Sequence, residues 1–125
     1  MEIISTKNAP GAIGPYSQAV AVNGMLYTSG QIAINPATGN VEATDIVGQS
    51  KQVMANLKAV LEAAGTSFDK VVKTTCFLKD VAKDFAVFNE IYAEAMGDAK
   101  PARSCVGVAD LPKGVLVEVE VIAVL

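Results

Sequence analysis

Arg103 is the one arginine in the chain, and it stands in the run Pro101-Ala102-Arg103-Ser104 at the start of an apolar segment. A planar guanidinium can donate two parallel hydrogen bonds to a carboxylate, whereas a lysine offers only a point charge. Strand alternation places Arg103 on the same face as Cys105. Two interpretations follow: Arg103 binds the carboxylate of a substrate, or it is an ordinary surface arginine whose ion pair contributes little.

Glu118 and Glu120 are the second candidate pair, because they alternate with valines in the run Val117-Glu118-Val119-Glu120-Val121. Alternation puts both carboxylates on one face of a strand. They can point to solvent from an edge strand, which is the structural interpretation. A glutamate partly removed from water is also the group that serves as a general acid or base near neutral pH. The pattern alone does not choose between the two glutamates.

Other polar groups could line a small-molecule pocket. Tyr16 lies in a Gly- and Pro-rich loop, Ser29 and Gly30 lie in a turn, and Asn89 lies in a helical stripe. Their hydroxyl and amide groups suit a binding site, although each residue taken alone is more typical of capping, turn or packing roles. Cys105 has no histidine to activate it, and we interpret it as a small buried residue rather than a nucleophile.

Several classes of chemistry find no support. The chain contains no histidine and no CxxC pair, which excludes histidine-ligated metals and histidine-based triads. Its carboxylates do not occur at the spacings typical of metal ligands, and its glycines form neither a dinucleotide-binding nor a phosphate-binding motif. We therefore predict no metal and no cofactor. A net charge of -3 also argues against a nucleic-acid partner, which requires clustered cations.

The helices and strands that would position these groups are predicted from the Gly, Pro and Asn residues that mark the turns and loops between them. Residues 9–16 must form a loop. The two short strands 18–22 and 25–29 flank Asn23-Gly24, the dipeptide that favours a type I′ hairpin turn. A second turn is expected at 36–39, followed by a helix from Asp45, as N-cap, to Gly65.

The second half of the chain predicts a strand, a helix and two further strands. The strand covers 71–79, with Val72, Thr74, Cys76 and Leu78 on one face, and the helix runs from about Asp84 to Met96. The last strands cover 102–108 and 115–124. Together with a short first strand at 3–6, this order predicts an α+β fold with a single mixed sheet of about six strands and two helices on one face. Phe77 and part of the last strand would lie on the uncovered face, which favours a homo-oligomer.

Composition sets the remaining limits. With 125 residues, the chain is predicted to form one domain over 1–125. Its content of 51% hydrophobic and 18% charged residues also indicates self-association. Cys76 and Cys105 sit in apolar, strand-like runs and are interpreted as reduced thiols. Because no targeting pattern and no apolar run of ~20 residues is present, we expect a cytoplasmic protein without a membrane partner.

A resemblance to a known family covers essentially the whole chain. The motifs that carry it are Ala9-Pro10, IGPYSQA at 13–19, Ser29-Gly30-Gln31, Pro36 with Thr38-Gly39, Asn56-Leu57, VVKTT at 71–75, Asn89 with Tyr92, and Pro101-Ala102-Arg103-Ser104 leading through Leu111-Pro112 to Glu118-Val119-Glu120. On these motifs the sequence resembles the Rid (YjgF-like) family, and within it the RidA group of enamine/imine deaminases. The C-terminal motif is the most specific of the set.

The resemblance implies a chorismate-mutase-like fold and a homotrimer whose clefts lie between subunits. It implies that Arg103 binds the substrate carboxylate and that Glu118 manages the attacking water. Tyr16, Ser29, Gly30, Asn89 and Cys105 would contact the substrate. The reaction would be hydrolysis of short 2-imino acids, formed from enamines such as 2-aminoacrylate, to 2-keto acids and ammonia, without a cofactor.

A second function class remains open at this point. A non-catalytic trimer with the same arginine could bind 2-keto acids or act on a protein partner, since binding requires Arg103 but not a competent glutamate. A ribonuclease role fits poorly with one arginine, no histidine and an acidic chain. Replacing Arg103 and Glu118 separately distinguishes catalysis from binding.

Overall fold

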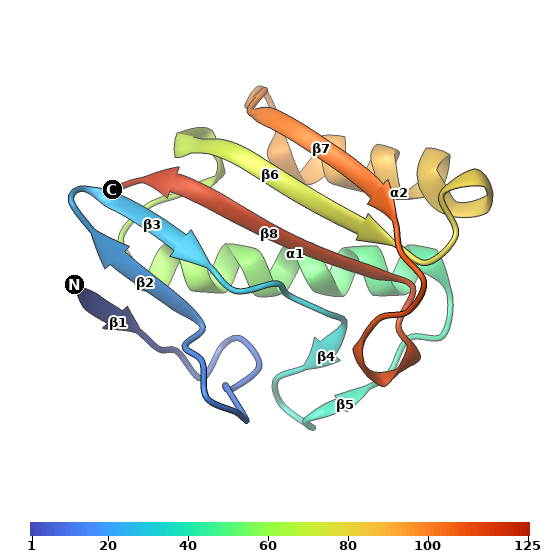
Figure 1. Cartoon of the computed structure of the whole chain (residues 1–125), viewed down its shortest axis with the longest axis horizontal. Helices are drawn as coiled ribbons and strands as arrows, with labels where there is room; N and C mark the ends of the chain where they lie inside the picture. Colours follow the sequence, from blue (N-terminus) through green and yellow to red (C-terminus); the bar gives the residue numbers. More distant parts are fainter.

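The computed structural model describes residues 1–125, and its main feature is a six-stranded mixed sheet (Figure 1). The strands lie in the spatial order β1-β2-β3-β8-β6-β7. Every neighbouring pair is antiparallel except β6 and β7, which are parallel. The strands of this sheet are β1 (Glu2–Ile4), β2 (Ala19–Val22), β3 (Met25–Thr28), β6 (Val71–Leu78), β7 (Ala102–Gly107) and β8 (Val117–Val124).

Two helices cover one face of the sheet, and Figure 1 shows both of them behind it. They are α1 (Ile46–Ala63) and α2 (Val81–Met96). The core lies between the helices and the sheet, where Leu57, Phe88 and Val119 are fully buried. The α+β fold with six strands and two helices on one face is therefore confirmed. Neither helix combines the length and hydropathy that crossing a bilayer would require.

The hairpin predicted at Asn23-Gly24 is present and links β2 to β3. Asn23 has a φ of 52° and Gly24 a φ of 75°, the two positive values that a type I′ turn requires. After β3 the chain forms a second, two-stranded sheet of β4 (Ile34–Asn35) and β5 (Asn40–Val41), which the sequence analysis did not predict. Strands of two residues are too short for alternation to be detected, although the turn between them is the one predicted at 36–39.

Both helices begin after an aspartate that accepts a hydrogen bond from a backbone N–H of the first turn. Asp45 caps α1 at 2.9 Å, as predicted, and Gly65 follows the helix end with a φ of 81°. Helix α2 begins at Val81, earlier than the predicted Asp84, because Asp80 supplies the cap at 3.1 Å. Val81 packs against the core four residues before Phe85, so the apolar stripe already begins in the first turn and the prediction placed the start of α2 three residues too late.

Strand β6 departs from regular alternation near its start. Thr74, Cys76 and Leu78 are buried beneath the helices, as predicted. Val72 is 44% exposed instead, so its predicted place on the core face is wrong. A β-bulge after Val71 shifts the register against β8, which turns Val71 into the core and Val72 outward.

Strand β8 lies in the middle of the sheet, between β3 and β6. The interpretation of Glu118 and Glu120 as residues of an edge strand is therefore wrong, because both edges of β8 are hydrogen-bonded. The register pairs Glu118 with Phe77 and Glu120 with Thr75 on the helix-free face. Val117, Val119 and Val121 of β8 face the helices, whereas Ile122 and the 40% exposed Val124 lie on the open face, as predicted for part of this strand.

Candidate active site

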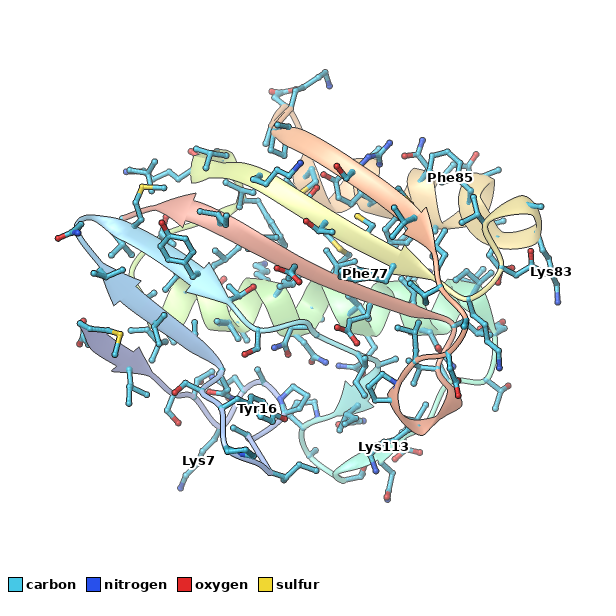
Figure 2. The ribbon with its side chains drawn as sticks, viewed as in Figure 1. Lys7, Tyr16, Phe77, Lys83, Phe85 and Lys113 are labelled. Carbon is cyan, nitrogen blue, oxygen red and sulfur yellow. The ribbon has the colours of Figure 1, made fainter.

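A cavity of about 380 Å³ opens beside the start of β8. We call it the glutamate cavity, and Figure 2 shows Tyr16 and Lys113 at this end of the molecule. Its walls are connecting segments: the loop before β2, the segment after β3, and the 3₁₀ turn Pro112–Gly114. Its lining includes Pro10, Gly11, Ile13, Tyr16, Ser29, Gly30, Ile34, Lys113 and Glu118. Four predicted site residues thus meet here: Tyr16, Ser29, Gly30 and Glu118.

The Glu118 carboxylate has no cation within pairing distance, since Lys58–Glu62 is the one ion pair in the chain. Burial raises the pKa of Glu118, and the nearby Glu120 carboxylate raises it further. Both causes favour the protonated form, because burial removes water from the charged carboxylate and the charge of Glu120 repels it. Such a carboxyl is suited to accept and return a proton close to neutral pH.

Gln18 fixes one wall of the glutamate cavity, and the sequence analysis missed this role. Its Oε1 accepts from the Thr6 N–H at 2.7 Å, and its Nε2 donates to the carbonyls of Thr6 at 3.0 Å and Pro10 at 2.7 Å. The side chain is buried. Because loop carbonyls and amide groups removed from water need partners, Gln18 orders the loop that continues to Tyr16.

Two amides of α1 fix the other walls. Asn56 Nδ2 donates to the carbonyls of Ile32 at 3.1 Å and Ile34 at 3.0 Å, in the segment after β3. Gln49 Oε1 accepts from the Leu116 N–H at 2.8 Å, just before β8. These residues were also missed. The available signal was that Asn56 falls within the apolar stripe of α1, where a buried amide must have partners.

Arg103 lies elsewhere, between β7 and α2. Its Nη1 donates to Asn89 Oδ1 at 2.7 Å, and its guanidinium carbon lies 4.8 Å from the centroid of the Tyr92 ring and 5.6 Å from that of Phe85. The Tyr92 hydroxyl is held in turn by Thr74 Oγ1 at 2.8 Å. We call Arg103, Asn89, Tyr92, Phe85 and Cys105 the arginine group. The cation–π contacts and the amide orient the guanidinium.

The two cysteines are free thiols on neighbouring strands, Cys76 on β6 and Cys105 on β7. Burial raises the pKa of Cys76 to about 12, with a further contribution from Cys105. Burial also raises the pKa of Cys105, although the charge of Arg103 opposes this shift. Since the thiolate is the nucleophile, neither cysteine is activated for attack at neutral pH.

The arginine group and the Glu118 carboxylate lie on opposite faces of the sheet. Arg103 is in register with Thr74, which faces the helices, whereas Glu118 is in register with Phe77. Figure 2 shows Phe77 on the near, helix-free side. The predicted residues therefore form two groups: Asn89 and Cys105 accompany Arg103, while the others line the glutamate cavity.

Comparison with known proteins places this fold and these residues in one family. The family model described as Endoribonuclease L-PSP matches residues 6–125, and the chain belongs to this family, the Rid (YjgF-like) proteins. A crystal structure from Entamoeba histolytica is 60% identical, with a TM-score of 0.97 and coverage of 99% of this chain and 98% of that one.

Two further relatives are similar over nearly their whole length. The 2-iminobutanoate/2-iminopropanoate deaminase of Escherichia coli K12 is 51% identical over 97% of this chain and 95% of that protein. The structure of RidA from the Antarctic bacterium Psychrobacter is 43% identical, with a TM-score of 0.95 and complete coverage of both chains. The chain is thus homologous to an imine deaminase of this family.

Proposed function

We propose that this protein hydrolyses short 2-imino acids to 2-keto acids and ammonia, in a cleft that two subunits of a homotrimer form together. The observation that carries the proposal is the division of the site. An oriented guanidinium without an anion and a half-buried carboxylate without a cation lie on opposite faces of one chain. Each supplies what the other half lacks, and a neighbouring subunit can bring them together. The 51% identity to the Escherichia coli deaminase supports the same reaction.

In the proposed mechanism, Arg103 binds the substrate carboxylate through its free N–H groups. The C=N carbon is already electrophilic, so a positioned water can add once a base takes its proton. Glu118 accepts that proton and passes it to the imine nitrogen. Glu118 then takes the hydroxyl proton of the resulting carbinolamine and gives it to the nitrogen, so that ammonia leaves as the C–N bond breaks and the carbonyl forms. This sequence consumes one water and leaves Glu118 in its starting state.

The other predicted residues shape the cleft around these two groups. Tyr16 and Ser29, with Gly30, would border the substrate on the side of Glu118, and Asn89 and Cys105 would border it on the side of Arg103. The helix-free face, with Phe77 and Ile122, is the surface that a closed ring of subunits would cover. A trimeric ring would then form equivalent clefts between neighbours.

The decisive experiment generates 2-iminobutanoate in situ and follows the keto acid formed with the parent protein and with Glu118→Gln. We expect ~100-fold slower hydrolysis, the loss typical of removing a positioned acid–base group, with binding of a 2-keto acid retained. Glu120→Gln, on the same face, is the control and should keep most activity. Equal rates for the parent and Glu118→Gln would contradict this mechanism and favour a binding protein for keto acids. A larger loss in Glu120→Gln would assign the role to the other carboxylate.

A further inference from the structure

Gly30 lies directly against the carboxylate of Glu118. A Cβ atom built on Gly30 would be 2.1 Å from Glu118 Oε2, 2.7 Å from Cδ and 3.0 Å from Cγ. Ordinary van der Waals contact begins at about 3.4 Å, so the first two distances are collisions and the third is an unusually tight contact. The space next to Gly30 that a side chain would fill is occupied by the Glu118 carboxylate.

The backbone around Gly30 is held on both sides. Gln31 exchanges two hydrogen bonds with Val119, its N–H donating at 2.8 Å and its carbonyl accepting at 3.1 Å. The Ser29 N–H donates to the Gln18 carbonyl at 2.9 Å. Val119 directly follows Glu118, so the segment is anchored to the strand that carries the carboxylate. These hydrogen bonds oppose a movement of Gly30 that would make room for a side chain.

The conformation of Gly30 does not itself require glycine. Five glycines of the chain have a positive φ, among them Gly24 and Gly65, and Gly30 is not one of them. An alanine can adopt the backbone conformation of Gly30 without left-handed strain. The reason for glycine at position 30 is the close approach of the Glu118 side chain.

We propose that Gly30 is a positioning residue for Glu118: the missing Cβ leaves the place in which the carboxylate is held at the edge of the glutamate cavity. The inference rests on the proposed function, because it assigns to Gly30 the placement of the group that transfers the proton. This role is distinct from binding of the substrate by the backbone N–H of Gly30, because alanine would keep that N–H. Gly30→Ala therefore changes the position of the carboxylate and leaves the local backbone groups in place.

Displacement of the carboxylate has a measurable electrostatic consequence. Within the chain, the ionisable groups around Glu118 are Glu120 on the same strand and Tyr16 and Lys113 on the cavity walls, while its partner on β6 is the uncharged Phe77. The proposed trimer adds the arginine group of a neighbouring subunit, which is the same in the parent and in Gly30→Ala. A Cβ at position 30 forces the carboxylate out of this place, and the open space that Glu118 borders is the glutamate cavity. Because burial is the main cause of its raised pKa, the pKa of Glu118 should fall toward the ordinary value in Gly30→Ala.

The experiment measures the Glu118 carboxyl by carbon-13 NMR titration and imine hydrolysis by the coupled assay, in the parent and in Gly30→Ala. The Glu118 signal is identified by its absence in Glu118→Gln. We expect a lower pKa together with a loss of roughly 10- to 100-fold in kcat, as follows from a misplacement of about 1 Å. Gly11→Ala is the matched control for the titration, because a Cβ there meets nothing within 4 Å. It should leave the Glu118 pKa unchanged, and an unchanged pKa in Gly30→Ala would overturn the inference.

A double-mutant cycle, read by melting temperature, tests the inference when Gly30→Ala is too unstable to assay. Gly30→Ala should lower the melting temperature when Glu118 is present and have little effect in a Glu118→Ala background, where the colliding atoms are gone. An equal loss in both backgrounds would overturn the inference. If the parent hydrolyses no imine, the proposed function fails, but the titration and the melting cycle still decide whether Gly30 positions Glu118.

Discussion

The guanidinium of Arg103 is oriented by its own chain and still lacks an anion. Asn89 accepts one of its five N–H donors, and the rings of Tyr92 and Phe85 lie against its face. No carboxylate of the chain forms an ion pair with it. An arginine in this condition is ready to bind a carboxylate from outside the chain at little cost in side-chain entropy. Within the chain, the ion pair that the alternative interpretation assumed for a surface arginine is not formed.

Arg103→Lys should therefore lose activity although the charge is kept. An ammonium cannot form two parallel hydrogen bonds and cannot stack on Tyr92 as the guanidinium does. Loss of a charge-assisted hydrogen bond, worth about 1.5–3 kcal/mol, corresponds to roughly a 10- to 100-fold reduction in kcat/KM for imine hydrolysis. Circular dichroism should report an unchanged fold. Parent-level activity on every imino acid tested would show that Arg103 does not bind the carboxylate.

The raised pKa of Glu118 also predicts how stability depends on pH. The folded chain holds this proton more tightly than the unfolded chain, so the free energy of unfolding falls as pH rises from the ordinary value of 4.5 through the raised value. Glu118→Gln removes the titration. Urea denaturation should show the variant to be more stable than the parent at neutral pH, and this gain should vanish in acid. A stability difference that is constant with pH would contradict the assigned burial.

At the scale of elements, α1 is the part that holds the cavity walls in place. Its amides bind the segment after β3 and the start of β8, so the loops have fixed partners on a rigid helix. Fixed loops place Ser29, Gly30 and Glu118 relative to one another without help from a ligand. The geometry of the cavity is thus set in part by Asn56 and Gln49, which do not line it.

Asn56→Leu should destabilise the chain, because it leaves the carbonyls of Ile32 and Ile34 without their donor. The expected loss is about 1–3 kcal/mol in the free energy of unfolding, measured by urea denaturation. Ser50→Ala is the control on the same helix. The Ser50 hydroxyl is buried and has no hydrogen-bond partner, so its removal should be neutral or stabilising. If Ser50→Ala lost as much free energy of unfolding as Asn56→Leu, the loss in Asn56→Leu could not be assigned to its hydrogen bonds.

Local signals in the sequence were sufficient for most elements. The Asn23-Gly24 turn, the cap at Asp45 and the apolar period of α1 each act within a few residues, and each was confirmed. The bulge after Val71 and the short strands β4 and β5 were not predicted. A bulge depends on the partner strand, and a strand of two residues has no pattern of its own.

The candidate site was predictable in its residues but not in its arrangement. Residue type and motif singled out Arg103 and Glu118. Their placement on opposite faces depends on the register of β7 and β8 against β6, which is set by contacts between segments far apart in the chain. The role of Gln18 was not predicted for a similar reason. Its hydrogen-bond partners lie in a loop, where hydrophobic periodicity gives no information.

At the scale of the whole molecule, the separation of Arg103 and Glu118 predicts the activity of mixtures of two variant chains. If the site forms between subunits as proposed, preparations of Arg103→Ala alone and of Glu118→Gln alone should both be nearly inactive. Co-expression of the two chains should restore about a quarter of the parent activity, because half of the arginine groups and half of the carboxylates in a randomly mixed oligomer are intact. Light scattering on the same samples checks the trimer. If both groups of a site came from one chain, no mixture would regain activity.

The distribution of tyrosines gives each half of the site its own spectroscopic label. The chain has three tyrosines and no tryptophan. Tyr16 borders the glutamate cavity, Tyr92 lies under the Arg103 guanidinium, and Tyr27 lies on the open face in register with Ile122. Fluorine-labelled tyrosine would give one resonance for each environment. Ligand binding at either half, and burial of the open face in the proposed trimer, would then be visible as separate signals from a protein without substitutions.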